Sequence, residues 1–169
     1  AAKARLFEVP GLEQVVINIG DPFGRELAQK LAGRVPLTAV WLGADALGWL
    51  AERTLHADEV AADASGIALQ LGGSFGKQPL ATGLLGRFNA ENALVVIACL
   101  TSLGVTLKDA AGALAECTAP PGRMQVVGPA GRDSVTGDAM TRDAAMRGQP
   151  LVVVDYAHTP DALAKALGA

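Results

Sequence analysis

The spacing of apolar residues along the chain first describes a strand, a helix and a second strand. Residues 14–21 (QVVINIGD) form a β-branched apolar run that ends in a turn signal. Residues 22–33 (PFGRELAQKLAG) carry apolar side chains at helical spacing, and residues 35–43 (VPLTAVWLG) are strand-like again. This order is typical of parallel α/β winding, so the first part predicts a parallel sheet with a covering helix.

The pattern changes to a period of two between residues 56 and 86. GIALQLGG alternates apolar residues with polar or small ones, Gly-Gly-Ser interrupts it, and PLATGLLG resumes it. This predicts a small antiparallel meander. Two helices are expected next, at residues 90–104, where Gly104 ends the first, and at residues 106–118.

The last part begins with a mixture of Pro, Gly and charged residues. Residues 119–149 predict a hinge at their start and an exposed loop over 128–149. The stretch PLVVVDYAHTPDAL then predicts a buried strand that runs into a helix with Thr159 as its N-cap. This pair of elements is expected to begin a second domain. The opening AAKARLF looks like the last turn of a helix, so we expect a segment of a longer protein.

Composition narrows the class of protein. The 169 residues carry 14 Lys and Arg against 17 Asp and Glu, for a net charge of −3, and no basic run. A nucleic-acid surface needs clustered Lys and Arg to meet phosphates, so no nucleic-acid partner is expected. The longest strictly apolar run, ALVVIACL at 93–100, is too short for a membrane span, and no signal peptide is expected. We expect a cytoplasmic protein.

Candidate chemistry gathers where the last strand ends. Asp155 follows the apolar run and His158 precedes the predicted helix. Ligands bind at the carboxyl ends of strands in open α/β sheets, where a carboxylate can hold ribose hydroxyls and an imidazole can contact a base or phosphate. Polar residues are also common in such turns, so the alternative is that Asp155 caps the turn and His158 is simply exposed.

Two further stretches offer groups that could bind a nucleotide. GLLGRFNAENAL places Asn89 at a plausible N-cap and Asn92 three residues later, so both amides are expected on one side of the helix's first turn. An amide has a donor and an acceptor, as the edge of adenine requires, although capping alone explains Asn89. Arg123 follows a Pro-Gly turn, where it could reach a phosphate across the hinge or be a solvated surface arginine.

These residues lie in stretches that resemble the Mur ligases: AAKARLF, GLLGRFNAEN, PPGRMQVV and VVVDYAHTPDALAKAL, in this order. The resemblance covers nearly the whole chain, is closest to the members that add the third amino acid, and is most specific at DYAHTPDAL after GRM. It implies an α/β fold. Residues 1–118 would be the C-terminal half of a central, P-loop-type ATPase domain, with a parallel sheet and a small antiparallel meander. Residues 119–149 would be the hinge and loop, and 150–169 the start of a Rossmann-like C-terminal domain.

The resemblance also implies an activity. Such enzymes use ATP and Mg²⁺ to make an acyl phosphate on a UDP-N-acetylmuramoyl-dipeptide in peptidoglycan synthesis, and a free amino acid, diaminopimelate or lysine in this subgroup, then attacks it. A cytoplasmic monomer is expected. Asn89 and Asn92 match the asparagines that contact adenine, and Arg123 matches the hinge arginine that contacts an ATP phosphate. Asp155 and His158 match the residues that close over the nucleotide.

Lys3 in AAKARLF matches the lysine that these enzymes carbamylate, which creates a carboxylate that helps to hold a second Mg²⁺. Without the resemblance, a surface helix lysine would be the simpler interpretation. The family's phosphate loop, its magnesium-binding Glu and His, its uridine-nucleotide domain and its amino-acid-selecting motif have no counterpart here, so the 169 residues alone are expected to be inactive. A catalytically silent nucleotide-binding or scaffold module, or a related ligase such as cyanophycin synthetase, remains the alternative.

Overall fold

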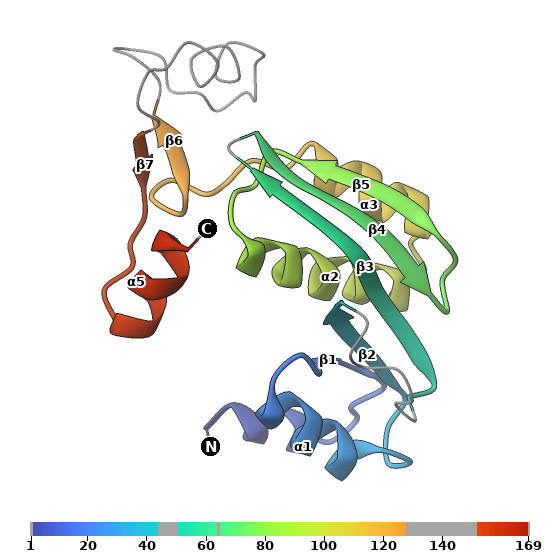
Figure 1. The fold of residues 1–169 in the computed structure, drawn as a ribbon. Helices are drawn as coiled ribbons and strands as arrows, with labels where there is room; N and C mark the ends of the chain where they lie inside the picture. The colour runs from blue at the N-terminus through green and yellow to red at the C-terminus, as the bar shows by residue number, and fades with distance from the viewer. Residues whose placement is uncertain (1, 44–50, 64, 128–151, 169) are drawn as a thin grey trace.

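The computed structural model describes residues 2–43, 51–63, 65–127 and 152–168. Within them, one five-stranded sheet runs in the order β1-β2-β3-β4-β5 and a separate two-stranded sheet pairs β6 with β7 (Figure 1). The strands of the larger sheet are β1 (Val15–Asn18), β2 (Leu37–Leu42), β3 (Arg53–Asp63), β4 (Gly66–Gly73) and β5 (Gln78–Thr82).

The predicted parallel strands and the predicted meander form a single sheet. β1 pairs with β2 in parallel, and β2 pairs with β3 in parallel. β3 also pairs with β4 antiparallel, and β4 with β5 antiparallel. β3 therefore belongs to both halves, which joins the meander to the parallel strands edge to edge. The sequence pattern indicates each half but not this shared strand.

Helices cover the sheet much as the apolar spacing predicts. α1 (Pro22–Leu31) connects β1 to β2, and α2 (Arg87–Ser102) and α3 (Leu107–Ala115) follow β5. Before β1, residues Ala2–Glu8 form a 3₁₀ helix, η1, where the sequence predicted the last turn of a helix. Gly104, with φ of 94°, follows the C-cap Leu103 of α2. The amide of the next residue, Val105, donates to Leu100 O at 3.1 Å, a Schellman ending that bears out the predicted stop at Gly104.

The side chains of β2 enter two hydrophobic cores on opposite faces of the sheet. Val40 packs with β3, β4, α2 and α3, whereas Ala39 and Trp41 pack with β1 and α1. The Trp41 ring also stacks on His56 of β3, with ring centroids 4.9 Å apart and planes inclined by 16°. Trp41 is 7% exposed and belongs to the core under α1.

The last described elements lie to one side of the large sheet (Figure 1). β6 (Gln125–Val127) and β7 (Val152–Val154) pair antiparallel, and α5 (Pro160–Leu167) follows. Thr159 caps α5, since its hydroxyl accepts a hydrogen bond from Ala162 N at 3.2 Å, as the sequence predicts. The predicted loop over 128–149 lies outside the described residues, and the predicted domain boundaries stay a prediction.

The close approach of α1 to β1 should be a steric requirement for the fold. A Cβ at Gly24, in the first turn of α1, would lie 1.8 Å from Asn18 O of β1. Because the obstacle is backbone, it cannot give way by rotating, and we expect Gly24→Ala to lower the free energy of unfolding by roughly 2 kcal/mol or more. Urea unfolding followed by circular dichroism measures this loss.

Gly112→Ala in α3 is the matched control. No atom lies within 4 Å of a Cβ at Gly112, so the same substitution should raise the free energy of unfolding by about 0.5–1 kcal/mol through helix propensity alone. Equal effects of the two substitutions would contradict the steric interpretation.

Candidate functional site

The first turns of α2 carry a connected pair of amides. Asn89 Nδ2 donates to Leu85 O at 2.7 Å, which fixes the orientation of the Asn89 amide. Asn92 Nδ2 donates to Asn89 Oδ1 at 3.2 Å. Asn89 is half-buried and Asn92 is exposed. Asn92 therefore keeps its Oδ1 and its second N–H available to a ligand, while Asn89 orients it.

Asn89 is not the N-cap that the sequence predicted. α2 begins at Arg87 with Gly86 as its N-cap, at φ of 86° and ψ of 137°, and no side chain caps it. Asn89 lies in the first turn, where its backbone N–H donates to Gly86 O at 2.9 Å. The error has a physical cause. Gly86 starts the helix by adopting a backbone conformation that favours glycine, and such a cap has no polar side chain to mark it.

The carboxyl end of β1 lies against this part of α2. Asn18 Nδ2 donates to Glu91 Oε2 at 3.2 Å, and Asn18 Oδ1 accepts from Gly20 N at 2.8 Å. Asp21 caps α1 by accepting from Gly24 N at 2.9 Å. Asn18 thus joins the NIGD turn to the first turns of α2. The sequence gives no sign of the Asn18–Glu91 contact, because no local spacing relates positions 73 residues apart.

A second group of polar side chains lies where β6 begins and β7 ends. Asp155 follows β7 directly, and its Oδ2 accepts from Met124 N at 2.9 Å. Asp155 is half-buried, and it caps a chain 31 residues away instead of its own turn. Met124 has φ of 49°, a left-handed conformation that is uncommon outside glycine, and its side chain is buried.

Arg123 and His158 approach the same tyrosine. Arg123 follows a turn closed by its backbone N–H, which donates to Pro120 O at 3.0 Å. Its Cζ lies over the Tyr156 ring, 5.5 Å from the centroid. The His158 ring centroid is 5.0 Å from that of Tyr156, and His158 Nδ1 lies 3.0 Å from Tyr156 O. Since a carbonyl can only accept, Nδ1 carries the proton and Nε2 is left for other partners.

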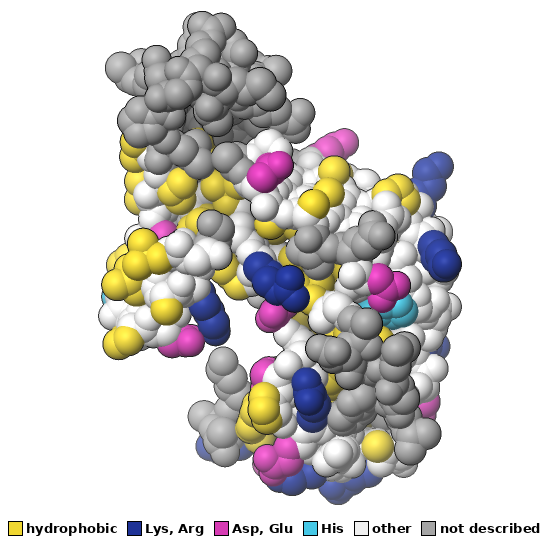
Figure 2. All heavy atoms as spheres, viewed as in Figure 1, with side chains coloured by type: hydrophobic (Ala, Val, Ile, Leu, Met, Phe, Trp, Pro, Cys, Tyr) yellow, Lys and Arg dark blue, Asp and Glu magenta, His cyan; other side chains and the backbone are white. Residues whose placement is uncertain are grey.

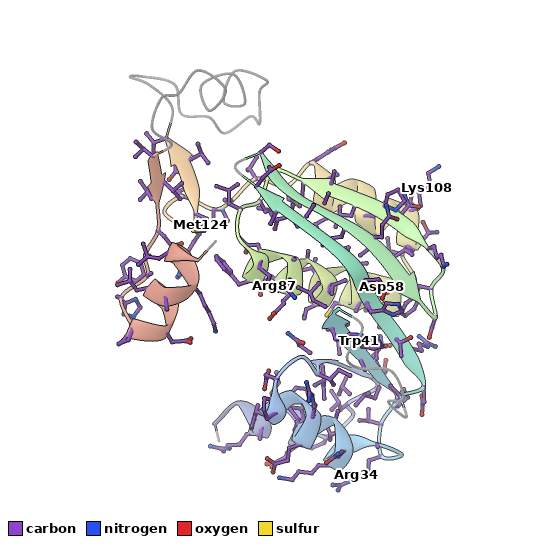
Figure 3. The ribbon with its side chains drawn as sticks, viewed as in Figure 1. Arg34, Trp41, Asp58, Arg87, Lys108 and Met124 are labelled. Carbon is purple, nitrogen blue, oxygen red and sulfur yellow. The ribbon has the colours of Figure 1, made fainter. Side chains whose placement is uncertain are left out.

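The structure therefore brings the predicted residues together in two groups. Asn89 and Asn92 form the group on α2, and Arg123, Asp155 and His158 form the group around Tyr156. In Figure 2 an open gap lies between the part of the surface formed by the C-terminal elements and the body of the molecule. Figure 3 labels two neighbours of these groups, Arg87 at the start of α2 and Met124 beside β6.

Charge relates α5 to the carboxyl end of β1. The Asp161 carboxylate, 3.0 Å from Lys165 Nζ, raises the pKa of Lys165. The carboxylates of Glu91 and Asp21 raise the pKa of Lys165 further. Lys165 is fully exposed to solvent, so this attraction is weak and screened by salt. It nevertheless has the sign that favours approach of α5 to Glu91 and Asp21.

Lys3 lies in η1, and its side chain is outside the described part of the structure. Among the residues that the structure describes, no group of three or more His, Cys, Asp or Glu side chains could hold a metal ion. The described side chains therefore do not build a Mg²⁺ site by themselves. No helix within the same residues is long and apolar enough to cross a membrane.

Comparison with known proteins identifies the family to which this fold belongs. The profile of the Mur ligase middle domain matches residues 1–100, and the chain belongs to the Mur ligase family. Proteins named UDP-N-acetylmuramoyl-L-alanyl-D-glutamate--2,6-diaminopimelate ligase are similar to it. The one from Janthinobacterium sp. (strain Marseille) is 40% identical over 98% of this chain, and the one from Pseudomonas aeruginosa is 39% identical over all of it. The chain spans 30% of the length of each.

Solved structures of the family have the same fold. A diaminopimelate ligase of the same name superposes with a TM-score of 0.66 at 28% identity, covering 99% of this chain and 30% of that one. MurF from Acinetobacter baumannii superposes with a TM-score of 0.69 at 17% identity, covering 97% of this chain and 30% of that one. The predicted α/β architecture, with part of a Mur ligase ATPase-type middle domain, is thereby confirmed.

The Asn18–Glu91 contact can be tested by charge. Asn18→Asp keeps the acceptor for Gly20 N but places a carboxylate beside Glu91, so we expect a loss of about 1 kcal/mol or more in the free energy of unfolding. In a Glu91→Gln background the same substitution should cost less, since the second carboxylate is gone. A double-mutant cycle from urea unfolding measures the difference, and additive effects would contradict the contact.

Proposed function

We propose that this chain is the ATP-binding and domain-joining part of a Mur ligase that adds the third amino acid to UDP-N-acetylmuramoyl-L-alanyl-D-glutamate in the cytoplasm. The added amino acid would be diaminopimelate, which the names of the similar proteins carry. The observation that carries the proposal is the match over 98% or more of the chain at 39–40% identity. The two groups of polar side chains support it, because each has hydrogen-bond donors or acceptors that could bind a nucleotide.

In this proposal the amides of α2 bind the base. Asn92 offers one acceptor and one donor to the edge of adenine, and Asn89 holds it through the contact between Asn92 Nδ2 and Asn89 Oδ1. Arg123 donates to an ATP phosphate, for which its planar guanidinium is suited. His158 Nε2 is the free ring nitrogen that would face the nucleotide. ATP supplies the phosphoryl group that activates the substrate carboxylate as an acyl phosphate.

Asp155 has a double part in the proposal. Its Oδ2 holds the backbone of Met124, and the remaining lone pairs of the carboxylate could accept from ribose hydroxyls when the two groups approach. Closure of this kind completes a site and excludes water from it. Mg²⁺ belongs to the proposed chemistry of the longer protein, and this chain's candidate contribution to it is a carbamate on Lys3.

The proposal is tested with the longer protein. We expect ADP release that depends on UDP-N-acetylmuramoyl-L-alanyl-D-glutamate and on diaminopimelate, with lysine a poor replacement. Asn92→Ala should raise the KM for ATP about tenfold, as loss of two hydrogen bonds of roughly 0.5–1.5 kcal/mol each predicts. Nucleotide binding without ADP release in the presence of both substrates would favour a silent nucleotide-binding module and contradict the proposal.

The 169-residue chain alone should release no ADP. Phosphoryl transfer depends on positioned phosphates and a positioned metal ion, and the described residues hold no cluster suited to a metal. A coupled assay for ADP with both substrates measures this. Acceptor-dependent ADP release from the pure chain would show that the proposed division of the active site is wrong.

Lys3→Ala in the longer protein should lower kcat far more than it changes the KM for ATP. A carbamate on Lys3 would be a carboxylate that acts near the phosphates and not at the base, so loss of the amine removes turnover but not adenine binding. Formate or acetate should restore part of the turnover. Full activity of Lys3→Ala without either acid would disprove the carbamate.

A further inference from the structure

Tyr156 is a large aromatic side chain that packing does not explain. It is the chain's single tyrosine, it directly follows Asp155, and it is 65% exposed. Its contacts are with Arg123, whose Cζ lies 5.5 Å from the ring centroid, and with the His158 ring at 5.0 Å and an inclination of 53°. One exposed ring thus touches both side chains to which the proposed function gives a nucleotide contact.

The backbone on both sides of this ring is held in place. The hydrogen bond from Met124 N to Asp155 Oδ2 joins the residue after Arg123 to the residue before Tyr156. Pairing of β6 with β7 begins at the next position, where Gln125 lies opposite Val154. Gln125 Oε1 also accepts from Gly122 N at 2.9 Å, which closes the turn that carries Arg123. Arg123 and Tyr156 are therefore neighbours through a frame of fixed hydrogen bonds.

We propose that Tyr156 is a positioning residue, which holds the guanidinium of Arg123 ready for an ATP phosphate. This inference rests on the proposed function. The ring attracts the cation through its π face and occupies none of the five N–H donors, so all of them stay available to phosphate oxygens. Holding a long side chain in one place before the ligand arrives reduces the entropy lost on binding.

The same frame places the pivot of domain closure before Arg123. Arg123 contacts Tyr156, and the residue after it is bonded to Asp155, so on closure Arg123 would move with Asp155 and His158 and not with α3. The chain that can bend lies between the end of α3 at Ala115 and the turn at Pro120. The sequence predicted a hinge that includes Arg123, and these contacts favour a pivot before that residue instead.

The test compares Tyr156→Leu with Tyr156→Phe in the longer protein. Leucine removes the π face, and we expect the KM for ATP to rise about two- to fivefold, which is the measured scale of an exposed cation–π contact. The KM for the dipeptide substrate should not change, and Tyr156→Phe should restore most of the affinity for ATP. Leu167→Ala, at an exposed position of α5, controls for loss of apolar surface from the same part of the chain.

Two results would overturn the inference in an active protein. An unchanged KM for ATP in Tyr156→Leu would show that the ring does not position Arg123, and equal damage by Phe and Leu would assign the effect to the hydroxyl. A wild-type protein without acceptor-dependent ADP release would instead overturn the proposed function. In the 169-residue chain, nuclear Overhauser effects between the Tyr156 ring and the Arg123 side chain test the contact itself, and their absence would contradict it.

Discussion

Both hydrophobic cores depend on β2, because this strand contributes side chains to each of them. Its side chains point alternately into the core under α1 and the core under α2 and α3, and five of its six residues are buried. A strand with both faces covered cannot shift by one residue, because such a slip would exchange every side chain between two differently shaped cores. The register of β1 on one edge of β2 and β3 on the other is therefore fixed by packing. So is the level at which each strand ends.

That fixed level decides where the polar groups lie. Asn18 ends β1 beside the start of α2, and Gly24 brings α1 close enough that a Cβ would strike the Asn18 carbonyl. The amides of Asn89 and Asn92 are thus mounted on a helix that packs on the sheet. The group around Tyr156 is held differently, by the two-stranded sheet of β6 and β7 and by the hydrogen bond from Met124 N to Asp155 Oδ2. The α2 group is therefore supported by a hydrophobic core, whereas the group around Tyr156 is supported by few contacts.

Local patterns predicted most elements of the fold but not the contacts between distant segments. Apolar spacing and turn residues predicted β1, α1, β2 and the Thr159 cap, because each signal lies within a few residues of the element it describes. The resemblance named Asn89, Asn92, Arg123, Asp155 and His158, and the structure brings them into two groups. The Met124–Asp155 hydrogen bond and the Asn18–Glu91 contact join positions 31 and 73 residues apart, which no periodicity records. The Gly86 cap escaped prediction because its signal is a backbone angle.

α5 has no buried residue, so its unfolding would cost the two hydrophobic cores no contacts. Its support consists of the Thr159 cap, which contributes about 1 kcal/mol, and the exposed Asp161–Lys165 pair, which is screened by salt. An eight-residue helix with no more than this is marginal in water. It can melt and re-form while both cores stay intact, and its amides would then exchange with solvent long before those of β2. The exposed apolar side chains of Leu163 and Leu167 would stabilise the helix whenever another surface buries them.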